Sequence, residues 1–108
     1  MLKRKFRIPK GESFAKAYDV HFPLFFLKIK TQPLSYSRCG VVISKKIDKR
    51  ATVRNRMRRV MSSIFEHHRL YENKGYDMLF ILKKPFDGSR EDLEQMVLSA
   101  VKTGTQKI

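Results

Sequence analysis

The chain has 108 residues, of which 42% are hydrophobic, enough for one small domain with a single core and no need of disulfides. Lysine and arginine number 24 against 10 acidic residues, which gives a formal net charge of +14. So many positive charges repel one another in a compact fold, which indicates a polyanionic partner. Nucleic acid is the first candidate and an anionic membrane surface is the second.

The N-terminal residues 1–10 are mostly basic and show no periodicity, which predicts an extended arm that becomes ordered on a partner. Their start resembles a signal peptide, but no apolar run follows, and the single Cys39 fits a reducing compartment. The longest apolar run, residues 78–82, is far below the roughly 20 residues of a membrane span. We therefore expect a cytoplasmic protein without a membrane partner.

The next segments predict one helix and two strands. Residues 12–20 suit a short helix with Phe14 and Tyr18, four positions apart, on one face. Residues 24–30 alternate between apolar and polar side chains, which predicts a strand with one buried face. Residues 36–44 predict a second strand, and we expect the two strands to pair as an antiparallel hairpin.

The second half of the chain predicts the longest helix, a buried strand and a last helix. In residues 51–70 apolar side chains recur at helical spacing and form one stripe. After a glycine-containing break, residues 76–82 read as a buried strand and residues 83–88 as a loop. Ser89 is then expected to cap a last helix that ends near Gly104.

Basic side chains gather around the start of the long helix, on a broad exposed arc opposite its apolar stripe, with Arg56 beside the core. Many arginine runs are only solvated helix faces, but here no acidic residue occurs between Lys49 and Ile64 to relieve the repulsion. Guanidinium groups match phosphate oxygens, and Asn55 can reach a sugar hydroxyl or a base edge. The candidate RNA-binding residues are Lys45, Lys46, Arg50, Arg54, Asn55, Arg56, Arg58 and Arg59.

Residues 40–59 resemble the signature segment of bacterial ribonuclease P proteins, because Ser44, Lys45 and Lys46 close a strand and the run RNRMRR opens the long helix. The expected order of elements is similar over nearly the whole chain. One departure lies in the loop at residues 47–51, which is one residue longer than the commonest form of the family and has Asp48 where glycine is usual.

The resemblance and the pattern of elements imply an α+β domain over residues 1–108, with residues 1–10 as its basic arm. The expected order is α-β-β-α-β-α, with a small mixed, mainly antiparallel sheet. The family also implies a left-handed β-α-β crossover through the long basic helix, an exception to the usual hand.

The resemblance further implies the protein subunit of ribonuclease P, which binds the catalytic RNA and the 5′ leader of precursor tRNA to promote endonucleolytic 5′ maturation. The chemistry is expected to belong to the RNA and its Mg²⁺, so the protein alone is expected to be inactive and to need no protein partner. Aromatic rings beside cations suit an unpaired strand. The implied leader-binding residues, which we expect to line one groove, are Phe14, Tyr18, Phe26, Lys28 and Lys30. The alternative for Phe14 and Tyr18 is that they are core residues.

No protein metal site is expected, because His67 and His68 point about 100° apart on a helix and have no ligand at suitable spacing. The main alternative function is a general RNA-binding or ribosome-associated protein that does not stimulate cleavage. A DNA-binding regulator is weaker, because no helix-turn-helix precedes the basic helix.

Overall fold

The structure, a computed structural model, describes residues 2–85 and 89–107. Residues 86–88 of the expected loop, and Met1 of the expected arm, lie outside the described residues. In chain order the elements are the one-turn helix η1 (Arg4–Phe6), strands β1 (Tyr18–His21), β2 (Phe25–Thr31) and β3 (Arg38–Val42), helix α1 (Ala51–His67), the one-turn helix η2 (Leu70–Glu72), strand β4 (Tyr76–Leu82) and helix α2 (Arg90–Lys107).

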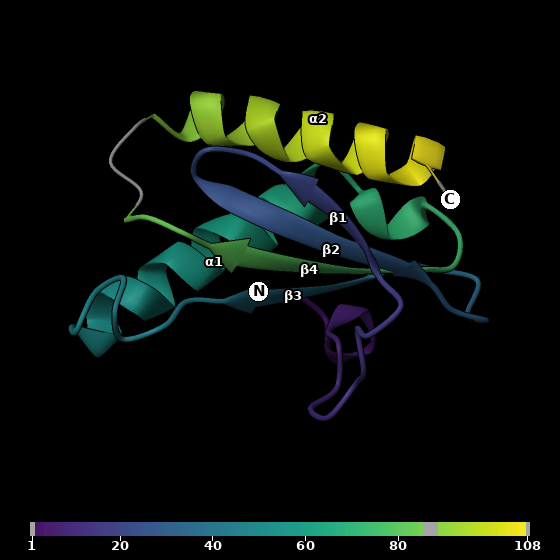
Figure 1. The fold of residues 1–108 in the computed structure, drawn as a ribbon, viewed down its shortest axis with the longest axis horizontal. Helices are drawn as coiled ribbons and strands as arrows, with labels where there is room; N and C mark the ends of the chain where they lie inside the picture. Colours follow the sequence, from purple (N-terminus) through teal and green to yellow (C-terminus); the bar gives the residue numbers. More distant parts are fainter. Residues whose placement is uncertain (1, 86–88, 108) are drawn as a thin grey trace.

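The four strands form one sheet in the order β1-β2-β4-β3 (Figure 1). The pairs β1/β2 and β2/β4 are antiparallel, whereas β3 runs parallel to β4. The expected α+β class and mainly antiparallel sheet are therefore confirmed. The expected hairpin of β2 with β3 is wrong, because β4 lies between them and pairs with β2 through seven residues and with β3 through five. The hand of the β3-α1-β4 crossover stays a prediction.

One face of the sheet forms the core under α1 and α2. In β2 the side chains of Phe25, Leu27 and Ile29 are fully buried, as the alternation predicts. They share a cluster with Met78 and Phe80 of β4 and with the apolar stripes of both helices. The intervening side chains of β2 consequently point to the other face of the sheet.

Both long helices form where the sequence predicts them. Helix α1 buries Met57, Met61, Ile64 and Phe65. At the start of α2 the hydroxyl of Ser89 accepts a hydrogen bond from the backbone N–H of Asp92 at 3.1 Å, as expected for a cap.

The end of α2 differs from the prediction, because the helix runs past Gly104 to Lys107. A Cβ atom at Gly104 would lie 3.0 Å from Ile29 Cγ2, so this glycine allows α2 to approach β2 closely. None of the described helices is long and apolar enough to cross a bilayer.

The N-terminal segment departs most from expectation. The helix predicted over residues 12–20 is wrong, because its last residues, from Tyr18 onward, join the sheet as β1. Residues 2–8 also pack on the domain: Leu2 and Phe6 are buried, and the backbone N–H of Ile8 donates to Cys39 O at 3.1 Å. The chain then crosses the face of the sheet that the helices leave open. The side chain of Ile8 lies there against Gly40 of β3, in the space that a side chain at Gly40 would occupy.

Candidate nucleic-acid interface

Asp48 organises the loop that leads into α1. Its carboxylate accepts hydrogen bonds from the backbone N–H of Arg50 at 2.9 Å and from the Arg50 guanidinium at 3.1 and 3.0 Å. These bonds, the side-chain contact first, lower the pKa of the Asp48 carboxyl. The guanidinium of Arg54 donates to the carbonyl oxygens of Asp48 and Lys49, both at 2.9 Å. Hydrogen bonds from Arg50 and Arg54 therefore fix the conformation of the loop before any partner binds.

The predicted RNA-binding residues gather at one end of the molecule, on this loop and the first half of α1. Arg58 is oriented by Asn55 Oδ1 at 2.9 Å and reaches Ile43 O at 3.4 Å. Arg50 and Arg54 are bonded within the loop, as described above. The remaining cations, Lys45, Lys46, Arg56 and Arg59, are exposed. Within residues 2–85 and 89–107, none of these four lies within salt-bridge distance of a carboxylate.

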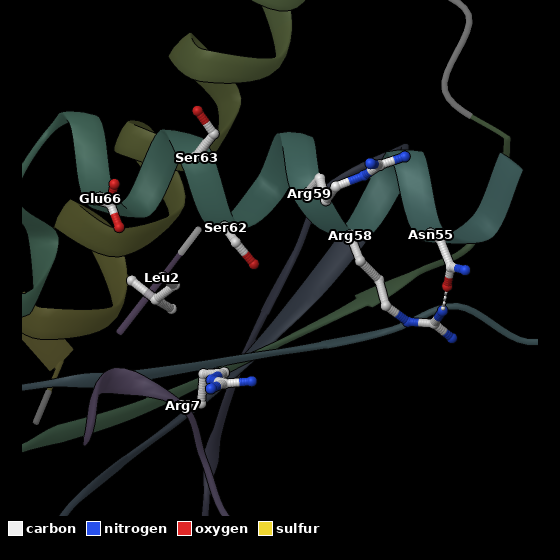
Figure 2. Close-up of a pocket in the computed structure, with 8 residues that line it drawn as sticks. All are labelled: Leu2, Arg7, Asn55, Arg58, Arg59, Ser62, Ser63 and Glu66. Carbon is white, nitrogen blue, oxygen red and sulfur yellow. Dashed lines mark hydrogen bonds between the residues drawn. The ribbon is translucent and has the colours of Figure 1, made fainter. Parts of the chain in front are cut away.

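A groove of about 690 Å³ runs beside this surface, between α1 and the N-terminal segment (Figure 2). Ser62 and Arg58 point from α1 toward the side on which Arg7 lies. Arg7 is placed there by a bridge to Cys39 on the edge of β3. The groove is lined by Leu2, Arg7, Asn55, Arg58, Arg59, Ser62, Ser63 and Glu66.

The open face of the sheet carries the predicted leader residues Phe26, Lys28 and Lys30 of β2. Both lysines have acidic partners: Lys28 Nζ lies 3.3 Å from Asp19 Oδ1, and Lys30 Nζ lies 2.6 Å from Glu12 Oε1. Hydrogen bonding by the Lys30 ammonium lowers the pKa of the Glu12 carboxyl. In the free protein, therefore, an incoming phosphate has to compete with these two carboxylates.

The two predicted aromatic residues of the N-terminal segment are separated by the structure. Phe14 stays near the open face, where Lys30 Nζ lies 4.9 Å from its ring centre. Tyr18 is opposite Ile29 in the register and so shares the face that the helices cover, with Lys107 Nζ 5.2 Å from its ring centre. The expectation that Tyr18 lines one groove with Phe26, Lys28 and Lys30 is wrong, because it assumed a helix where a strand forms.

Comparison with known proteins decides the family. Residues 2–104 match the family described as Ribonuclease P. The chain belongs to the ribonuclease P protein family. It is 33% identical over 95 residues to the ribonuclease P protein component of Clostridium beijerinckii, covering 86% of this chain and 75% of that protein. To the component of Clostridioides difficile it is 35% identical over 94 residues, covering 85% and 76%.

Solved structures of ribonuclease P proteins share the fold. The protein from Thermotoga maritima matches with a TM-score of 0.76 and 23% identity, covering 83% of this chain and 86% of its own. The protein from Staphylococcus aureus matches with a TM-score of 0.77 and 21% identity, covering 91% and 94%. The ribonuclease P protein is a component of a holoenzyme that processes tRNA, in which RNA carries the catalytic role. RNA binding and tRNA processing therefore follow for this member of the family.

Several residues of the two surfaces of this ribonuclease P protein were missed by sequence reasoning. On the open face His21 stacks on Phe26 with ring centres 5.4 Å apart, and Lys83 Nζ lies 5.7 Å from the Phe26 ring centre. Arg7 in the groove and Glu12 on the open face were missed as well. A complete strand register would have indicated His21, which is opposite Phe26. No local pattern indicates Arg7, because its position depends on pairing with a strand more than thirty residues away.

The described part of the chain contains no group of three His, Cys, Asp or Glu side chains that could hold a metal ion. His68 instead contacts Glu94 of α2, with Nε2 and Oε2 3.2 Å apart. This contact ties the end of α1 to α2 and lies away from both surfaces.

Proposed function

We propose that this chain docks on the catalytic RNA of ribonuclease P through the loop and the first half of α1. The observation that carries this proposal is that one loop and the first half of α1 carry a set of residues of which most are exposed: Lys45, Lys46, Arg50, Arg54, Asn55, Arg56, Arg58 and Arg59. The bonds of Asp48 with Arg50 and Arg54 hold the loop in advance, so less conformational entropy is lost when phosphates bind. Residues 1–108 act as one domain in this function.

The open face of the sheet supports a second part of the proposal, binding of the 5′ leader of precursor tRNA. Phe26 offers a ring for stacking, while Lys28 and Lys30 can exchange their carboxylate partners for leader phosphates. Phe14 adds a second ring at the edge of the same face. Because this set contains rings and cations but few hydrogen-bonding groups that read base edges, it favours an unpaired strand with little sequence preference.

The Mg²⁺ of the holoenzyme belongs, in this proposal, to the RNA. The protein's cations neutralise phosphates that metal ions would otherwise screen, which lowers the Mg²⁺ needed for cleavage. Cleavage promotes 5′ maturation of tRNA in the cytoplasm, with the RNA supplying the catalytic groups and no further protein partner required.

The leader assignment is tested with the holoenzyme, assembled from the cognate RNA and this protein. Affinity is measured for precursor tRNA with a leader and for the same tRNA without one. Lys28→Ala is expected to weaken binding of the leader-bearing substrate severalfold and to leave the leaderless one unchanged. Lys102→Ala, the same charge change on an exposed position of α2, serves as the control. Equal losses for both substrates would contradict a leader site on this face.

A further inference from the structure

The groove between α1 and the N-terminal segment has two chemically different ends. Arg58 and its partner Asn55 lie at one end, while Leu2, Ser62 and Glu66 lie toward the other (Figure 2). On α1 the positions of Arg58 and Glu66 are a little over two turns apart, about 12 Å along the axis. With side-chain reach included, this separation suits the span from the phosphate of one nucleotide to the far edge of its base.

The wall opposite α1 is fixed before any ligand binds. The Phe6 ring stacks on Tyr71 with centres 4.4 Å apart and meets Tyr36 edge-on at 5.4 Å. The next residue, Arg7, bridges to Cys39 on the edge of β3. The backbone that carries the Arg7 guanidinium is thus anchored on both sides, which reduces the entropy lost when a ligand is bound.

The arginine side chains of the groove favour an anion, because they have no carboxylate partner among the described residues. In the part of the chain that the structure describes, no carboxylate oxygen lies within 4.0 Å of a guanidinium nitrogen of Arg7, Arg58 or Arg59. Arg58 points from α1 to the side on which Arg7 lies, whereas Arg59 extends from the other side of the helix (Figure 2). A phosphate with its forked acceptor oxygens can accept hydrogen bonds from the remaining donors of Arg7 and Arg58. The other end of the groove offers the apolar Leu2 side chain beside a hydroxyl and a carboxylate, which suits a base rather than a second phosphate.

We propose that this groove binds a single unpaired nucleotide of the catalytic RNA, with its phosphate against Arg7 and Arg58 and its base toward Leu2, Ser62 and Glu66. The proposal rests on the proposed docking of RNA on α1 and names one contact within it. Because a carboxylate only accepts hydrogen bonds, Glu66 favours a base edge with adjacent N–H donors. Guanine presents two such donors on its Watson–Crick edge, so guanine is the expected base, and it has to be unpaired to offer that edge.

The first test compares variants of the full chain for affinity to the cognate ribonuclease P RNA at fixed salt. Arg7→Ala is expected to weaken binding about tenfold, as for loss of one charge-assisted hydrogen bond. Arg4→Ala is its control, because it makes the same charge change on an exposed residue of the same segment outside the groove. Ser62→Phe fills the groove without changing charge and is expected to weaken binding as well, whereas His67→Phe, exposed at the end of α1, is not. Thermal unfolding of each variant confirms that it is folded.

The second test uses the free protein, so it does not depend on activity of the holoenzyme. Guanosine, adenosine and uridine 5′-monophosphate and inorganic phosphate are titrated while the amide resonances of the groove residues are followed by NMR. The guanine nucleotide is expected to shift the Ser62 and Glu66 amides most, and Glu66→Gln is expected to remove its advantage. Equal shifts with inorganic phosphate would overturn the proposal in favour of a simple anion site.

The two proposals fail in different ways. If Arg59→Ala weakens RNA binding but Arg7→Ala and Ser62→Phe do not, docking on α1 stands and the groove proposal is overturned. If the wild-type chain binds the cognate RNA no better than unrelated RNA, the docking proposal fails, and the nucleotide titration alone then decides whether the groove takes a nucleotide.

Discussion

Arg54 and Arg59 lie five positions apart on α1 and carry the same charge, but the structure gives them different surroundings. The Arg54 guanidinium is half-buried and donates to two loop carbonyls, of Asp48 and Lys49, both at 2.9 Å. Arg59 is exposed and extends from the helix at the rim of the groove (Figure 2). Replacing each by alanine therefore separates the stability of the loop from contact with RNA.

The expected magnitudes follow from these contacts. A hydrogen bond from a charged donor contributes about 1.5–3 kcal/mol when buried, and partial exposure of Arg54 reduces the combined effect of its two bonds to about 1–2 kcal/mol. For a domain of this size, a loss of about 1 kcal/mol lowers Tm by roughly 4–8 °C. Arg59→Ala is expected to change the free energy of unfolding by no more than about 0.5 kcal/mol.

The assay combines urea unfolding of the free protein with RNA binding at several salt concentrations. Arg59→Ala is expected to reduce the slope of log affinity against log salt by about 1, the effect of losing one phosphate contact. Arg54→Ala is expected to lower both stability and affinity. Both bonds of Arg54 come from Nη1, so Arg54→Lys, whose ammonium also has more than one donor, is expected to recover part of the stability. Equal stability losses for the two alanine variants would refute the division of roles between the arginines.

Three further outcomes follow from buried or paired groups. The guanidinium of Arg38 donates two hydrogen bonds, at 2.8 and 2.7 Å, to the carboxylate of the fully buried Asp77. Arg38→Met removes both bonds, so urea unfolding is expected to show a free energy of unfolding lower by about 3–5 kcal/mol. A loss below about 1 kcal/mol would contradict the importance of this buried pair. Burial raises the pKa of Cys39 to about 12, so its thiol is expected to react with iodoacetamide only after unfolding, and rapid labelling of the native protein would contradict this. Hydrogen bonding by Arg90, with a second contact from the other helix, lowers the pKa of Glu94 below its ordinary value of 4.5. The ionised Glu94 carboxylate therefore stabilises the fold above pH 4.5, and this stabilisation is lost as pH falls through the lowered pKa of Glu94. Glu94→Gln is expected to flatten the decline of Tm with pH over this acidic range. An unchanged decline of Tm would contradict a stabilising role of this carboxylate.

The parts of the fold that the sequence predicted are those whose signal is local. The alternation in β2, the apolar stripe of α1 and the buried run of β4 each follow from a period read within one segment. The N-terminal helix was wrong because a few apolar residues in a short segment fit both periods, and pairing of β1 with β2 decided between them. The β2/β3 hairpin was wrong because β4, far along the chain, inserts between these strands.

The candidate site, like the fold, could be predicted from the sequence only where its signal is local. The cations of the loop and α1 could be predicted because they are close in the sequence and share a helical face. Their partners could not: Glu12 reaches Lys30 across 18 positions, and Arg7 reaches the groove only through β3. Sequence reasoning noticed Asp48 as a departure from the family pattern, but only the structure shows that it holds the loop.

The most direct test of the central claim is cleavage of a precursor tRNA by its cognate ribonuclease P RNA at low Mg²⁺, with and without this chain. The protein is expected to stimulate cleavage strongly, and a variant with both Arg56 and Arg59 replaced by alanine is expected to lose most of that stimulation while remaining folded. A chain that binds the RNA tightly but leaves the cleavage rate at low Mg²⁺ unchanged would contradict the claim and favour a general RNA-binding protein.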